Sequence, residues 1–234
     1  MLRGNTIVKV TDESYYIRGP VPLTAETTDR YFPDLSGITL PKTPKGQVTF
    51  QKLLQAAEEV FGEKGYHDAS VVEVTMRAGV AQGTFYIYFE GKKDIFTQLI
   101  IHLHHDLRKT IQQEIASSRS RLEEETRGLV AYYRYLYKHA NLYKLLRDAE
   151  SVDQNLYRWY YHSFAEGYIR RIRKAMAKGE IREIDPEAAV YCLMGIATFT
   201  AMRWTGWEGR MPPESFLEGV VSFIHGGLTA APRP

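Results

Sequence analysis

Between residues 82 and 92 the sequence gathers several side chains that can recognise a nucleic acid. Glutamine at 82 can pair bidentately with adenine, and Thr84 can bond to a base or touch a thymine methyl group. The hydroxyls of Tyr86 and Tyr88 can hold phosphate, and the ammonium of Lys92 can neutralise it. These residue types predict a surface that reads base edges and binds the phosphate backbone.

The element that precedes this stretch carries its own start and stop signals. Ser70-Val71-Val72-Glu73 is a capping box, in which the serine accepts from the third helical amide and the glutamate returns to the cap amide. Ala78-Gly79-Val80 follows, where glycine permits the sharp reversal of a helix-turn-helix. A first helix is therefore expected at 71–78.

A second helix is expected at 82–88. Phe85 and Phe89 lie four residues apart and are expected to face inward, whereas Gly83 lets a backbone approach closely. The outward set is expected to be Gln82, Thr84, Tyr86 and Tyr88. The other interpretation of 70–89 is a capped helical hairpin with an aromatic core, and for the two phenylalanines that interpretation is favoured.

The run from Ala78 to Phe89, followed by Lys92, Asp94, Ile95 and Phe96, resembles the signature of the tetracycline-repressor (TetR) family. The resemblance is strong over residues 49–100. It implies an all-α fold with an N-terminal three-helix DNA-binding domain and a C-terminal helical domain for ligand binding and dimerisation. The DNA-binding residues expected here are Ser70, Gln82, Gly83, Thr84, Tyr86, Tyr88 and Lys92.

One residue departs from the family pattern. Ala81 stands where the family usually has a serine or threonine that caps the recognition helix. The loss of such a cap costs about 1 kcal/mol. Between Lys42 and Ile95 there are seven basic and seven acidic residues. This segment, which we call the reading head, is therefore neutral, and its affinity for DNA must come from a few well-placed contacts.

The composition is that of an ordinary globular protein. The net charge is +2, and the single cysteine rules out an internal disulfide. No signal-peptide pattern or run of apolar residues long enough to span a bilayer occurs, so we expect a cytoplasmic protein without a membrane partner.

Residues 1–46 differ from the rest because they hold five of the ten prolines and little helical periodicity. We expect an extension there, with a possible short hairpin from the runs at 6–10 and 14–18 and extended coil to Gly46. The domains expected are the extension at 1–46, the helix-turn-helix at 47–95, a ligand and dimer domain at 96–228 and a tail at 229–234. The predicted helices are 49–64, 71–78, 82–88, 92–117, 122–138, 141–150, 153–178, 186–205 and 213–226.

Aromatic residues are concentrated in the second half, and tyrosine, with 16 residues, dominates them. Two helical faces could line a cavity for a flat aromatic or a long acyl ligand, with arginines for a carboxylate or phosphate. Ordinary helix packing and surface salt bridges explain these residues equally well. The candidate ligand residues are Tyr133, Tyr137, Arg147, Tyr157, Tyr161, Phe164, Tyr168, Phe199 and Arg203.

No cofactor or metal site is expected. His102, His104 and His105 with Asp106 have helical spacings, but a solvated helix face explains them better. No nucleophile is paired with a base, and no loop could cradle phosphate, so an enzyme is not supported.

The last two helices alternate small and large apolar residues, which favours a four-helix interface between two chains. Such a twofold dimer places recognition helices about 34 Å apart and fits an inverted-repeat operator. We expect a repressor that a small apolar, aromatic or acyl effector releases from double-stranded DNA. The alternative is a ligand-independent architectural or protein-recruiting DNA-binding dimer, which a helical half without a pocket would favour.

Overall fold

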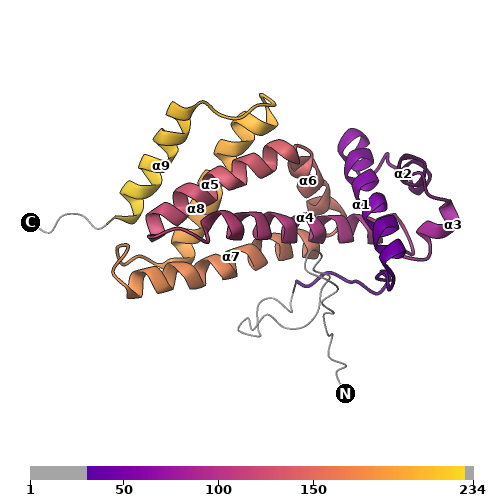
Figure 1. The fold of residues 1–234 in the computed structure, drawn as a ribbon, viewed down its shortest axis with the longest axis horizontal. Helices are drawn as coiled ribbons and strands as arrows, with labels where there is room; N and C mark the ends of the chain where they lie inside the picture. The colour runs from indigo at the N-terminus through magenta and orange to yellow at the C-terminus, as the bar shows by residue number, and fades with distance from the viewer. Residues whose placement is uncertain (1–30, 230–234) are drawn as a thin grey trace, which may run out of the picture. The chain divides into compact units, whose positions relative to one another are not determined.

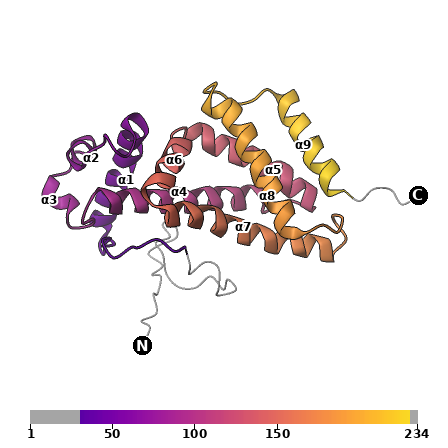
Figure 2. The ribbon, with the colours of Figure 1, turned by 180° about the vertical axis from the view of Figure 1, so that it is seen from behind.

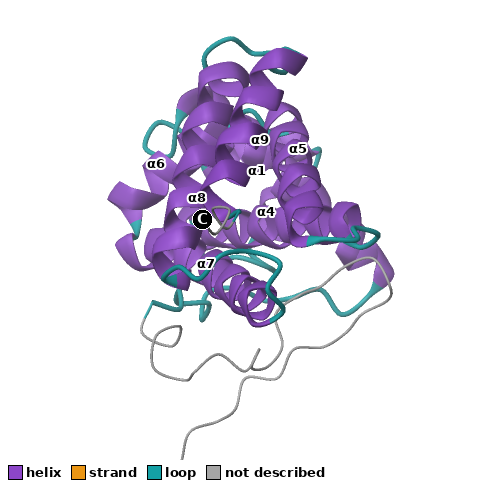
Figure 3. Ribbon diagram, turned by 90° about the vertical axis from the view of Figure 1, so that its left-hand side faces the viewer, coloured by secondary structure: helices purple, strands orange, loops and turns teal. Residues whose placement is uncertain are grey.

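The computed structural model describes residues 31–229, and the expected hairpin at 6–18 and the last five residues lie outside them. Within this range the chain is helical, as the fold class predicted, and Figure 3 draws helices joined by loops. No helix in 31–229 is long and apolar enough to cross a membrane. The α-helices are α1 (Pro44–Lys64), α2 (Val71–Ala78), α3 (Gln82–Phe85), α4 (Lys92–Ile115), α5 (Arg121–Lys138), α6 (Leu142–Val152), α7 (Gln154–Ala177), α8 (Pro186–Ala201) and α9 (Glu214–Leu228) (Figure 1).

The chain divides into two compact units. Unit 1 runs to His105 and adds Lys144–Tyr160, so it holds the whole helix-turn-helix together with α6 residues and the start of α7. Unit 2 consists of Asp106–Tyr143 and the chain from Tyr161 onward. Helices α4, α6 and α7 contribute residues to both units.

The predicted signals around α2 are confirmed. Ser70 accepts from the Glu73 amide and the Glu73 carboxylate returns to the Ser70 amide, which completes the capping box. Gly79 ends α2 in the left-handed region at φ 63°, and Gly65 ends α1 at φ 84°. Both glycines hold a backbone conformation that side-chain-bearing residues rarely adopt.

Helix α1 begins at Pro44, whereas the sequence prediction placed its start at Thr49. The Thr43 side chain caps the helix by accepting from the Gly46 amide, and Pro44 occupies the first turn. The apolar periodicity that marks the helix starts only at Phe50, because the first turn is polar and exposed. The cap at Thr43 and the proline at 44 therefore start α1 before the first residue of its hydrophobic face, Phe50.

An aromatic core connects α1 to the end of α3 within unit 1. Phe50 of α1 stacks on Phe89 with ring centroids 5.0 Å apart, and Phe85 lies 5.4 Å from Phe89. Phe85 and Phe89 are buried, which confirms their predicted inward orientation. Burying each such ring contributes roughly 1.5–3 kcal/mol, so these contacts hold α1 against residues 85–89.

In unit 2, α5 contacts both α8 and α9 (Figure 2). The end of α8 differs from the expected single helix at 186–205, because the chain widens into a π-helix over Met202–Gly206. Gly206 lies against Met202 and Tyr143, and an added β-carbon there would be 3.4 Å from the Met202 side chain.

Candidate nucleic-acid interface

The recognition helix is shorter than the predicted 82–88, because α3 ends at Phe85 and residues 86–88 continue as a turn. Ala81 supplies no side-chain cap, as predicted. At the other end, the Tyr88 carbonyl accepts from the Thr39 amide at 2.7 Å. The amides of Ile87 and Tyr88 donate to the carbonyls of Thr84 and Phe85, three residues back, so residues 86–88 form a turn and not a further α-helical turn.

The exposed part of this segment is made by Gln82, Gly83, Tyr86 and Ile87, while Thr84 is half-buried. Tyr86 is 54% and Ile87 60% exposed, so an apolar side chain joins the polar ones at the surface. Sequence reasoning missed Ile87, although its position beside Tyr86 in a segment with buried Phe85 and Phe89 was the available signal. This surface offers an amide, a hydroxyl and an aliphatic group to a groove.

Tyr88 was predicted to face outward, and that prediction is wrong. Its side chain is only 9% exposed, and its ring packs edge-to-face on Phe50 with centroids 5.5 Å apart. Its hydroxyl reaches the first turn of α1, 3.1 Å from the place where a β-carbon on Gly46 would lie. The tyrosine therefore contributes its ring to the core and leaves only its tip near the end of α1.

Lys92 lies inside a ring of carbonyls. Its Nζ donates to the carbonyl oxygens of Tyr66 at 2.7 Å, His67 at 3.0 Å and Ala69 at 2.8 Å. An ammonium has three donors, and all three are used here. A phosphate contact by Lys92 requires the loss of at least one of these bonds. Ser70 is similarly occupied, because its hydroxyl donates to Glu73 at 2.8 Å.

Other cations of the reading head differ in whether a carboxylate neutralises them. Arg77 pairs with Glu59 and Glu63, Lys64 pairs with Glu73, and Lys93 pairs with Asp153 at 2.8 Å. In the described part of the chain, no ion pair involves the exposed lysines near the start of α1, which are Lys42, Lys45 and Lys52.

In unit 2, tyrosine hydroxyls are bonded to threonines of α8. Tyr133 donates to Thr200 at 2.6 Å, and Tyr143 donates to the Thr198 carbonyl at 2.8 Å. The Tyr132 hydroxyl lies 3.3 Å from Thr198 Oγ1, and burial raises its pKa. These bonds lie just before the π-helix, a type of irregularity that is frequent at functional sites.

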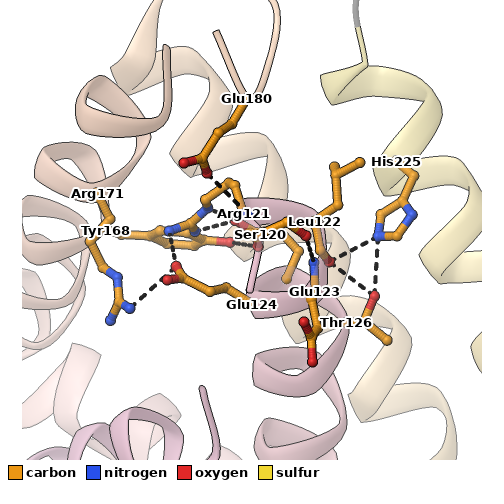
Figure 4. A network of polar contacts seen from close by, with 11 residues as sticks. Ser120, Arg121, Leu122, Glu123, Glu124, Thr126, Tyr168, Arg171, Glu180 and His225 are labelled. Carbon is orange, nitrogen blue, oxygen red and sulfur yellow. Dashed lines mark hydrogen bonds and ion pairs between the residues drawn. The ribbon is translucent and has the colours of Figure 1, made fainter. Parts of the chain in front are cut away.

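The Tyr168 hydroxyl has a different role, because it donates to the buried carboxylate of Glu125. Arg121 donates to the same carboxylate through Nε at 2.7 Å and to Glu124 at 2.8 Å. Burial and the neighbouring Glu125 raise the pKa of Tyr168 well above its usual value. This network joins α5 to α7, and His225 of α9 reaches it at Thr126 and the Leu122 carbonyl (Figure 4).

The nine candidate ligand residues fall into both units. Arg147 and Tyr157 belong to unit 1, where Arg147 is exposed. The other seven belong to unit 2, where Arg203 pairs with Glu208 at 2.6 Å, Tyr137 is 51% exposed and Phe199 is 63% exposed. Within unit 2, Tyr133 and Tyr168 are held by the bonds described above, and Tyr161 and Phe164 are half-buried.

Two arginines that sequence reasoning did not single out converge within unit 2. The nearest guanidinium nitrogens of Arg108 and Arg170 lie 3.4 and 3.9 Å from the position that a β-carbon on Gly167 would occupy. Burial lowers the pKa of Arg108, Arg170 lowers it further, and Glu166 acts in the opposite direction. The signal in the sequence was weak, because Arg108 and Arg170 lie on helices 62 positions apart.

Residues 53–99 match a family model described as bacterial regulatory proteins, tetR family. The chain is 30% identical to the HTH-type transcriptional regulator YdgC of Bacillus subtilis, over 79% of this chain and 94% of that protein. It is 27% identical to the fatty acid metabolism regulator protein of the same species, over 79% of this chain and 97% of that protein. A solved structure of the B. subtilis regulator FadR with stearoyl-CoA superposes with a TM-score of 0.69, at 21% identity over 76% of this chain and 98% of that one.

Proposed function

The chain belongs to the tetR family of bacterial helix-turn-helix transcriptional regulators, and from that premise we propose that it is a repressor released from DNA by an acyl effector. The family is one of regulators and not of enzymes. The observation that carries the proposal is the likeness to a fatty acid metabolism regulator over 97% of that protein's length. The exposed recognition segment supplies the DNA-reading part, and residues 47–95 are proposed as the DNA-binding domain.

The proposed base-reading residues are Gln82, Gly83, Tyr86 and Ile87, with Thr84 at the margin. Their groups suit a major groove, where glutamine recognises adenine and an aliphatic side chain meets a thymine methyl. The lysines Lys42, Lys45 and Lys52 are proposed to hold phosphates, because no carboxylate within the described chain neutralises them. We propose that Ser70, Tyr88 and Lys92 lie at the edge of this surface and stabilise the backbone that carries it.

The proposed dimer forms through α8 and α9. Large apolar side chains on these helices are exposed in the single chain: Tyr191 at 39%, Phe199 at 63% and Phe223 at 71%. A second copy that packs α8 and α9 against them removes this surface from water and creates a twofold axis. The operator is then an inverted repeat with half-sites about 34 Å apart. Since the operator is DNA, the proposed site of action is the cytoplasm.

The proposed effector combines an apolar chain with an anionic group. The aromatic residues of unit 2 suit the apolar chain of the effector. Arg108 is half-buried beside Arg170, and the Glu166 carboxylate offsets this cost only in part, so an added anion is favourable here. A carboxylate or a phosphate of an acyl-CoA has the required charge. Residues 96–228 are proposed as the effector and dimer domain.

Release is proposed to occur by a population shift. Helix α4 has residues in both units and directly follows the recognition segment in the chain, so its position can differ between the free and bound states. A coupling free energy of about 1–3 kcal/mol changes operator affinity some 5- to 150-fold.

The test combines binding and release. An operator is first selected from random duplexes by the full-length protein, and its affinity is measured with stearoyl-CoA, free coenzyme A or no addition. We expect stearoyl-CoA alone to weaken operator binding. Unchanged operator affinity across acyl-CoAs and fatty acids, together with no copurified lipid, would instead support the ligand-independent architectural dimer.

A further inference from the structure

A segment before the helix-turn-helix runs beside the recognition segment and is fixed to it. We call residues 32–41 the strap; it has no helix, turns once where the Ile38 amide donates to the Leu35 carbonyl at 3.1 Å, and leads through Thr43 into α1. Pro33, Gly37 and Pro41 of the strap are buried within unit 1. The helix-turn-helix motif itself does not require these residues, so their packing needs a separate explanation.

Two backbone hydrogen bonds join the strap to the residues that follow the recognition helix. The Thr39 amide donates to the Tyr88 carbonyl at 2.7 Å, and the Glu90 amide donates to the Gly37 carbonyl at 3.0 Å. Between them, Ile38 and Phe89 form an antiparallel bridge, the isolated bridge of the described chain. The pair fixes the register of residues 37–39 against 88–90, at the end of the exposed turn that carries Tyr86 and Ile87.

The start of the strap is attached to another helix of the same unit. The Phe32 ring packs edge-to-face on Trp159 of α7 with centroids 6.3 Å apart. Next to it, the Arg158 guanidinium lies 5.5 Å from the centre of the Tyr31 ring. The strap therefore connects the recognition turn to α7 by bonds at one end and ring contacts at the other.

The closest approach is at Gly37. A β-carbon there would lie 2.5 Å from Asp94 Oδ1 and 2.6 Å from Asp94 Cγ. Asp94 belongs to the first turn of α4, where its charge is favourable for the helix dipole. Since the carboxyl group is short and close to its backbone, a side chain at 37 must displace either Asp94 or the strap.

We propose that the strap positions the recognition segment for operator selection, with Gly37 as the residue that permits its close fit to Asp94. It acts without touching DNA, by holding residues 88–90 so that Tyr86 and Ile87 keep one orientation. The inference rests on the proposed operator reading, but it does not depend on the effector.

The first experiment compares two deletions in the full-length background. Removal of residues 1–30 keeps the strap and removal of residues 1–40 deletes most of it, while both keep Lys42 and Lys45. Each protein is titrated with the duplex selected by the full-length protein and with a scrambled duplex of equal composition. We expect the ratio of the two affinities to fall roughly 5- to 150-fold in the longer deletion only, which is the discrimination carried by one good base contact.

The outcomes separate the explanations. Equal weakening on both duplexes, accompanied by a lower melting temperature, means that the strap only stabilises the fold and overturns the proposal. A selectivity loss already complete in the shorter deletion also overturns it. A full-length protein without any duplex preference refutes the proposed operator reading, and the positioning role falls with it.

The second experiment tests the contact at Gly37 by a double-mutant cycle. Gly37→Ala should lower the affinity ratio, and addition of Asp94→Ala should restore most of it, because the obstructing carboxyl group is gone. Asp94→Ala alone controls for the loss of its charge. Gly91→Ala controls for an alanine at another glycine near the same carboxylate, where the distance from the β-carbon to Asp94 Oδ2 would be an ordinary 3.8 Å. Selectivity of Gly37→Ala equal to that of the unchanged protein, or failure of Asp94→Ala to restore it, contradicts the assignment.

Discussion

The Lys92 ammonium lies 2.7 Å from the carbonyl oxygen of Tyr66 and at a similar distance from two further carbonyls of the loop between α1 and α2. It therefore fastens that loop. We predict that Lys92→Met lowers the free energy of unfolding by about 1–3 kcal/mol, because three carbonyls lose a charged donor and two of these hydrogen bonds are part-buried. Urea denaturation measures this.

The matched control for Lys92 is Lys45→Met at the exposed start of α1. This change should leave stability intact and reduce the salt dependence of DNA binding by about one phosphate contact. If Lys92→Met reduces the salt dependence and Lys45→Met does not, the division of roles between the two lysines is wrong.

Tyr86 and Tyr88 are two residues apart but should behave in opposite ways. Tyr86→Ala is expected to weaken and relax operator selection with little change in stability, since its side chain is 54% exposed. Tyr88→Ala should cost roughly 3–5 kcal/mol of unfolding free energy, because its ring is part of the core with Phe50. Thermal melts and duplex titrations of both variants decide the matter, and similar stability losses would refute the contrast.

The capping box gives a pH dependence. The hydrogen bond from Lys64, and then that from Ser70, lowers the pKa of Glu73 from 4.5 to about 2. A carboxyl whose pKa is lower in the folded state stabilises the fold above pH 4.5, and this contribution is lost as the pH falls toward 2. We predict that Glu73→Gln flattens the decline in stability across this window, measured by urea denaturation at pH 7 and pH 3. The control is Glu90→Gln at an exposed glutamate, and an equal flattening there would contradict the prediction.

The helix-turn-helix was predictable from sequence because its signals are local. The Ser70 cap, the Gly79 reversal and the spacing of Phe85 and Phe89 each act within one or two turns, and the structure confirms all three. The orientation of Tyr88 was not predictable in this way, since it depends on Phe50 of another helix. Periodicity places a residue on a face but does not say which neighbour covers that face.

The same limit applies to contacts made across long stretches of chain. The bond between the Thr39 amide and the Tyr88 carbonyl joins residues 49 positions apart, and no residue near Tyr88 in the sequence predicts it. Arg108 and Arg170 come together only because the Arg108 side chain of α4 lies beside Gly167 of α7 in unit 2. For Lys92, the residue type indicated a charged contact, but the fold supplied carbonyls of residues more than 20 positions earlier.

The pair Arg108 and Arg170 allows the proposed effector to be tested separately from DNA. Arg108→Met should weaken stearoyl-CoA binding roughly tenfold or more, because a hydrogen bond to a charged group is worth about 1.5–3 kcal/mol. Binding of an uncharged fatty alcohol should change little, since it lacks the anion. The same change removes a half-buried cation that Arg170 repels and whose burial Glu166 offsets only in part, so the ligand-free protein should lose little stability. The control is Arg203→Met, where the guanidinium already pairs with Glu208 at 2.6 Å. Isothermal titration with both ligands gives the comparison. If Arg203→Met weakens acyl-CoA binding and Arg108→Met does not, the anion site lies at Arg203. If Arg108→Met weakens binding of the alcohol and of the acyl-CoA equally, Arg108 shapes the site of the apolar chain and does not bind the anion.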